Sequence, residues 1–63
     1  MDITTPCSGR HEIHLTDLEL RVICNCINES CNGISISEFE TRVGAEREEI
    51  EGMLDKLLAV LSK

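Results

Sequence analysis

Three segments with helical spacing of apolar residues, separated by two breaks, most constrain the fold of this 63-residue chain. The spacing predicts helices over residues 17–30, 38–43 and 46–62. Asn32-Gly33 and Gly44 are placed to end the first two helices, because glycine adopts the left-handed conformation without steric cost. We therefore expect one small helical domain over residues 15–63.

The starts of the first two helices carry the spacing of a capping box. Thr16 is followed three residues later by Glu19, and Ser37 is followed in the same way by Glu40. In this motif the hydroxyl accepts from the amide of the acidic residue, while the carboxylate accepts from the amide of the hydroxyl residue. The pattern predicts that the helices begin directly after Thr16 and Ser37.

Residues 1–14 show neither helical nor strand periodicity. Pro6, Ser8 and Gly9 are turn-forming residues, and no apolar run accompanies them. We expect these residues to form a flexible N-terminal arm, and the fold class to be all-α.

The apolar surface of the predicted helices is wider than one small core can cover. The first helix has one stripe at Leu20, Ile23, Cys24 and Ile27. A second stripe on its far side must meet the arm, the last helix or a partner chain. The last helix is either covered from two sides within the monomer or partly a dimer interface. We expect a homodimer, because a chain of this length is marginally stable alone. The apolar interface residues that we predict are Leu18, Val22, Cys26, Met53, Leu57 and Val60.

The charge balance favours a basic protein partner. Twelve acidic residues against six basic ones give a net charge of -6, so a polyanion or an anionic membrane is repelled at long range. With one Phe and no Trp or Tyr, the chain also lacks the aromatic platforms on which single strands stack. Solubility alone would explain the acidity equally well. The predicted partner-binding acidic face is on the last helix, at Glu46, Glu48, Glu49, Glu51 and Asp55.

Four cysteines raise the question of a metal site. Cys24 and Cys26 point about 200° apart on a helix, so both cannot ligate one ion. A site combining Cys7 and His11 or His14 with Cys26 or Cys31 stays geometrically open. Thiols that act as small hydrophobic side chains explain the count more simply, and we expect no metal and no cofactor.

The sequence shows no motif for catalysis or for membrane targeting. The chain has no phosphate-binding loop, nucleophile elbow or metalloprotease motif, so we expect no enzyme activity. It shows no signal-peptide pattern and no run of about 20 apolar residues. We expect a cytoplasmic protein, where thiols stay reduced.

The stretch LTDLELRVICNCINE…NGISISEFETRVGAEREEIEGMLDKLLAV resembles the helix-turn-helix core of winged-helix regulators, including the MarR-like group. Gly44 and Ile50 hold the places of the glycine before the recognition helix and of its apolar anchor. The resemblance implies a three-helix fold and DNA binding by residues 46–62. Two features depart from it: no wing hairpin follows the third helix before Lys63, and the recognition position is acidic. In size and acidity the chain also resembles small accessory proteins from early regions of lambdoid phages, which reprogramme host regulators. No sequence motif supports this resemblance.

Basic groups near the turn are few. Arg42 and Arg47 each stand four residues from an acidic residue, Glu38 and Glu51 respectively, so we expect intrahelical ion pairs rather than phosphate contacts.

Taken together, these patterns predict an all-α, three-helix, helix-turn-helix-like domain that forms a dimer. Its predicted function is that of a small acidic regulatory or adaptor protein acting by protein–protein binding. The alternatives are a DNA-binding transcriptional regulator and a purely structural oligomerisation module.

Overall fold

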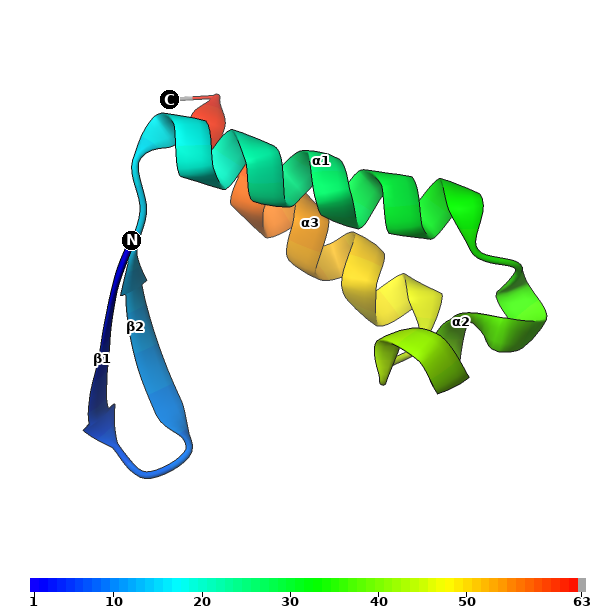
Figure 1. The fold of residues 1–63 in the computed structure, drawn as a ribbon, viewed down its shortest axis with the longest axis horizontal. Helices are drawn as coiled ribbons and strands as arrows, with labels where there is room; N and C mark the ends of the chain where they lie inside the picture. The colour runs from blue at the N-terminus through cyan, green and yellow to red at the C-terminus, as the bar shows by residue number, and fades with distance from the viewer. Residues whose placement is uncertain (63) are drawn as a thin grey trace.

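A β-hairpin followed by three helices makes up the fold in the computed structural model, which describes residues 1–62 (Figure 1). The elements in chain order are β1 (Asp2–Cys7), β2 (Arg10–His14), α1 (Asp17–Gly33), α2 (Ile36–Val43) and α3 (Arg47–Leu61). The expected all-α class is therefore wrong, because a two-stranded antiparallel sheet precedes the helices.

The hairpin occupies the residues for which we expected an arm without regular structure. Cys7 pairs with Arg10, so Ser8 and Gly9 form a two-residue turn. Gly9, the second residue of this turn, has φ +81°, and glycine adopts such a positive φ without steric cost. The register shifts between Thr4 and Cys7, a stretch that contains Pro6. Proline has no backbone N–H to donate, and an irregular stretch of a strand accommodates that missing hydrogen bond.

The two sides of the hairpin differ in polarity. Ile3 is the cross-strand partner of Ile13, and directly opposed residues project from the same side of a sheet. Met1 shares that side by alternation, whereas Asp2, Thr4, Glu12 and His14 alternate to the other. Every residue of both strands is exposed, so no second layer formed by residues 1–62 covers either side.

Helix α1 begins where the capping box predicted. The Glu19 amide donates to Thr16 Oγ1 at 3.2 Å, and the Thr16 amide donates to Glu19 Oε1 at 3.0 Å. These two bonds satisfy amides that a helix start otherwise leaves without a partner. Asp17 and Glu19 also lie at the positive end of the helix dipole.

The end of α1 lies later than the expected residue 30. The helix continues through Asn32-Gly33, which we had interpreted as a break. Asn32 Nδ2 donates to the Asn28 carbonyl at 2.8 Å, so this polar side chain bonds back onto the helix. Cys31 is buried and anchors the same turn. Burial and side-chain bonding thus override the weak local turn signal.

Helix α2 begins at Ile36 with Ser35 as its N-cap, two residues before the predicted Ser37. The capping box predicted from Ser37 and Glu40 does not form, and Ser37 Oγ lies 3.3 Å from Ser35 Oγ instead. Gly44 ends this helix in the left-handed conformation with φ +92°, as predicted.

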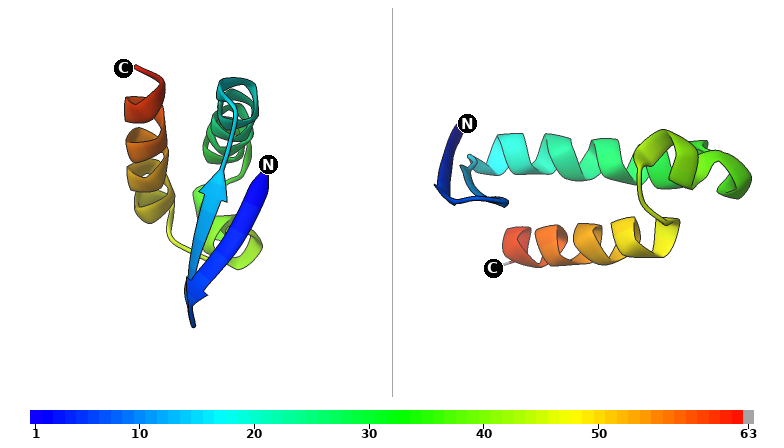
Figure 2. Two further views of the ribbon diagram at one scale, coloured as in Figure 1. Left: turned by 90° about the vertical axis from the view of Figure 1, so that its left-hand side faces the viewer. Right: turned by 90° about the horizontal axis from the view of Figure 1, so that it is seen from below.

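The core lies between α1 and α3, which run antiparallel side by side in both views (Figures 1 and 2). Leu20, Cys24 and Leu54 are its buried centre, and the half-buried residues packed against them are Leu15, Ile27, Leu57 and Leu61. Cys31 and Phe39 are buried near the α2 end of the molecule. The hairpin projects from the opposite end of the helical pair, the end at which α3 finishes (Figure 1). None of the helices within residues 1–62 has the length and apolar character needed to cross a membrane.

Candidate protein-binding surface

A groove lies where α2 turns into α3. Gly44 allows the turn, and its amide donates to the Glu40 carbonyl at 2.8 Å. The first turn of α3 is thereby brought against α2, and the groove between them has a volume of about 320 Å³. The lining residues are Ile36, Phe39, Glu40, Glu46, Arg47 and Glu48.

The groove combines an apolar interior with an acidic rim. Phe39 is only 1% exposed, whereas Ile36 on the same helix is 77% exposed. The carboxylates of the rim, all on exposed residues, are those of Glu40, Glu46 and Glu48. Such a surface suits a ligand that carries both an apolar side chain and positive charges.

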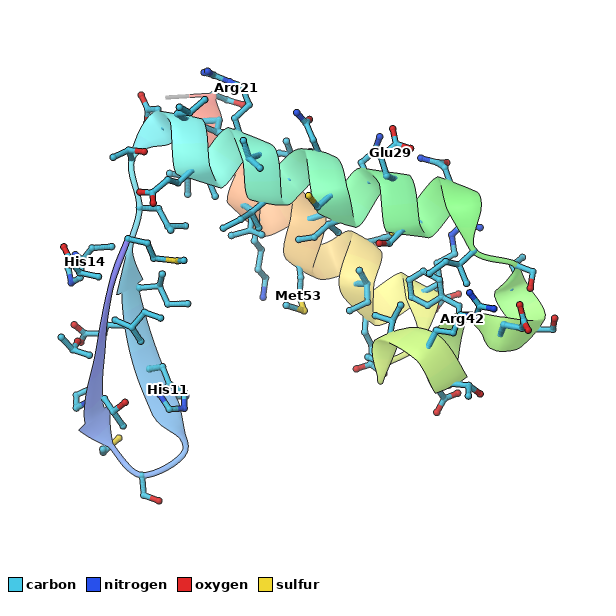
Figure 3. All side chains as sticks on the ribbon, viewed as in Figure 1. His11, His14, Arg21, Glu29, Arg42 and Met53 are labelled. Atoms are coloured by element: carbon cyan, nitrogen blue, oxygen red, sulfur yellow. The ribbon has the colours of Figure 1, made fainter. Side chains whose placement is uncertain are left out.

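The one cation in the groove lining is already paired. Arg47 Nε donates to Glu51 Oε1 at 2.7 Å, one helical turn along α3. Arg42 Nη2 lies 3.7 Å from Glu38 Oε2 on α2 (Figure 3). Both predicted intrahelical pairs are therefore confirmed. Exposed pairs of this kind contribute only about 0–1 kcal/mol to stability, but they reduce the charge available to an anion.

All five residues of the predicted acidic face are exposed, but they do not share one face. At 100° per residue, Glu48, Glu51 and Asp55 follow one flank of α3, at i, i+3 and i+7. Glu49 lies on the other flank, in line with Met53 four residues later. Glu46 is the N-cap residue of α3, and only Glu46 and Glu48 of the five line the groove. Glu40, which lines it from α2, was not predicted, because its role depends on how α2 packs beside α3.

Five of the six predicted apolar interface residues are exposed. Leu18 and Val22 are 68% and 51% exposed, and Met53 and Val60 on α3 are 55% and 56% exposed. Cys26 continues the stripe on α1 and is also exposed. Leu57 differs, because it is half-buried and packs against the core between α1 and α3.

A second, almost purely apolar groove lies at the junction of the hairpin and α1. It is lined by Met1, Leu18, Glu19, Val22 and Ile23. The N-terminal ammonium of Met1 lies 2.9 Å from Glu19 Oε2 and fixes the chain start against α1. The hydrogen bond from the Thr16 amide, followed by the bond and charge from this ammonium, lowers the pKa of Glu19 below its ordinary value of 4.5. The sequence patterns did not predict a role for the hairpin residues next to this groove. The signal that they give in the sequence is one isoleucine on each side of Ser8-Gly9.

The thiols and imidazoles are dispersed. Cys24 and Cys31 are buried, whereas Cys7 and Cys26 are exposed, and all four are free. His11 and His14 project from opposite sides of the hairpin, and His11 Nδ1 lies 2.9 Å from Thr5 Oγ1 (Figure 3). Across residues 1–62, no three His, Cys, Asp or Glu side chains converge as a metal site requires.

Comparisons of the chain with protein-family models, with curated proteins and with solved structures each find no match.

Proposed function

We propose that this chain is a small acidic regulatory or adaptor protein that binds a basic segment of a protein partner in the α2–α3 groove. The observation that carries the proposal is the pairing of an exposed apolar side chain, Ile36, with three rim carboxylates in one concave site. An amphipathic segment with Lys or Arg beside an apolar anchor matches this chemistry.

The charge distribution supports a basic partner over nucleic acid. Residues 38–56 hold seven acidic and three basic residues. Two of those three bases, Arg42 and Arg47, are engaged by carboxylates on their own helices. A DNA-binding regulator, the alternative, needs cations facing phosphates, and the exposed residues of α3 offer mainly carboxylates. The four free thiols fit the reducing cytoplasm in which we place the protein.

The carboxylates near the start of α3 also stabilise the helix dipole, so their presence alone does not require a partner. The test must therefore separate position from total charge. A labelled amphipathic peptide of Lys and Leu at helical spacing serves as the probe, and fluorescence anisotropy reports its binding. The groove variant combines three neutralising substitutions, Glu40→Gln, Glu46→Gln and Glu48→Gln.

The matched control neutralises three exposed carboxylates outside the groove, with Glu29→Gln, Glu49→Gln and Asp55→Gln. Both triple variants have the same net charge, so long-range attraction of the peptide is equal in the two. The groove variant should bind the peptide with a Kd at least about tenfold higher than that of the control, because only the groove variant loses ion pairs with the peptide. Equal affinities for the two variants would show that the groove is not the binding site.

A further inference from the structure

A group of exposed apolar residues lies at the junction of the hairpin and α1, remote from the α2–α3 groove. We call it the junction patch and define it as Met1, Ile3, Ile13, Leu18 and Val22. Each of these side chains is more than half exposed. Met1 links the two parts, since it lines the apolar groove on α1 and alternates onto the isoleucine side of the hairpin.

We propose that the junction patch is the interface through which two copies of this chain form a symmetric dimer. The first support is the amount of exposed surface. The chain has an accessible surface of 5100 Å² and a mass of 7.0 kDa. A compact monomer of that mass exposes about 4000 Å². The excess of about 1000 Å² per chain is close to the roughly 800 Å² that each partner buries in a standard interface.

The shape of the chain points to the same conclusion. Its Cα radius of gyration is 13.1 Å, whereas a compact domain of this length has about 10.6 Å. The hairpin accounts for the extension, because it projects away from the helices as the second arm of an L (Figure 1). An isolated two-stranded hairpin is marginal in water, and three or more strands with an apolar face are needed for stability. A second copy supplies two more strands with an identical apolar face.

The free edge of β2 gives this pairing a register. Among residues 1–62 each strand has a single neighbour, and the β1 edge is interrupted by Pro6 and the register shift. Antiparallel pairing of β2 with its copy about an axis at Ile13 places isoleucine opposite isoleucine. It also places Glu12 opposite His14 of the second copy, on the polar side. Moving the axis by one residue, to Glu12, would oppose like charges, which disfavours that register.

This arrangement keeps the carboxylates at the start of α3 in the two copies apart, whereas Asp17 and Glu19 of α1 stay near the interface, where the Met1 ammonium pairs with Glu19. The patch lies at the N-terminal end of α1, whereas the acidic first turn of α3 lies at the other end of the helical pair (Figure 1). Seventeen residues of helix span about 25 Å, which exceeds the roughly 8 Å Debye length at physiological salt. The net charge of -6 therefore opposes this dimer less than it would oppose one formed through the acidic groove.

Sedimentation equilibrium over a range of concentrations tests the proposal. The full chain should show twice the monomer mass at tens of micromolar, and a monomer mass up to roughly 1 mM would overturn the proposal. Ile13→Lys should raise the dimer Kd by at least about 100-fold, because one apolar anchor is lost from each copy. Leu18→Lys should do the same, and it keeps the hairpin sequence intact if Ile13→Lys disturbs the strand.

Ile36→Lys is the matched control, because it places the same charge on an exposed isoleucine at the far end of the molecule. It should leave the dimer Kd unchanged while blocking the basic peptide in the α2–α3 groove. Ile13→Lys should have the reverse effects, so failure of the dimer and failure of the groove are distinguishable. Retention of wild-type dimerisation by both junction variants, with helical circular dichroism preserved, would show that another surface pairs the copies and would overturn the proposal.

Discussion

Removal of the Phe39 side chain should cost this small protein much of its stability. Phe39 is 1% exposed and is the largest fully buried side chain in residues 1–62. Phe→Ala in a core costs about 3–5 kcal/mol, and we expect the lower end because the adjacent groove lets neighbours relax. A domain of this length has a total unfolding free energy of about 3–9 kcal/mol. Phe39→Ala should therefore leave the protein marginally folded or partly unfolded.

The comparison variant is Ile36→Ala, because Ile36 is on the same helix and is 77% exposed. Its unfolding free energy should change by no more than about 0.5 kcal/mol. Urea unfolding followed by far-ultraviolet circular dichroism is the suitable assay, since the chain has no Trp or Tyr. At a urea slope near 1 kcal/mol per molar, Phe39→Ala should lower the midpoint by about 3 M. All variants must be compared at one protein concentration, because dimerisation adds to stability. Equal midpoints for the two variants would refute the assigned burial of Phe39.

Three further predictions rest on single residues with internal controls. Gly44→Ala should lower the unfolding free energy by about 1 kcal/mol, because φ is +92° at this position. Gly52→Ala within α3 should raise the unfolding free energy by about 0.5–1 kcal/mol, since a Cβ there meets nothing within 4 Å. Equal shifts of the melting temperature for the two variants would contradict this. The pKa of Glu19 is lower in the folded chain, so the contribution of Glu19 to stability is present above pH 4.5 and is lost as the pH falls through the lowered value. Glu19→Gln should therefore reduce the fall in urea midpoint over this pH range. An unchanged fall in the variant would show that Glu19 does not cause the pH dependence. In a thiol-alkylation time course read by mass spectrometry, exposed Cys26 should be modified well before Cys24, which is 2% exposed on the same helix, and equal rates would contradict their assigned burial.

Local hydrogen bonding made parts of the fold predictable from the sequence. Thr16 and Glu19 lie within one turn, so their spacing alone specifies the reciprocal bonds that begin α1. Gly44 and the Arg47–Glu51 pair are likewise decided by neighbours along the chain. The start of α2 shows the limit of such patterns. Two overlapping Ser-x-x-Glu frames occur there, beginning at Ser35 and Ser37, and spacing does not choose between them.

The hairpin was missed because its strands give little periodic signal. Both of its sides are exposed, so only Ile3 and Ile13 carry apolar alternation, and their relation depends on the turn between them. The groove was found only in part for a different reason. Glu48 was predicted from α3 alone, but its place beside Ile36 follows from the packing of α2 against α3 across Gly44. No pattern along the chain encodes that contact.

The proposed function depends on binding of a basic protein segment in the α2–α3 groove. The most direct measurement titrates the protein into a labelled basic amphipathic peptide and, separately, into labelled random duplex DNA, each at about 50 and 200 mM salt. Peptide binding that Ile36→Lys abolishes, with no binding of the duplex at either salt, is the predicted result. Duplex binding that collapses at the higher salt, without peptide binding, would contradict the proposed function and would show that cations converge on a nucleic-acid site in the assembled protein.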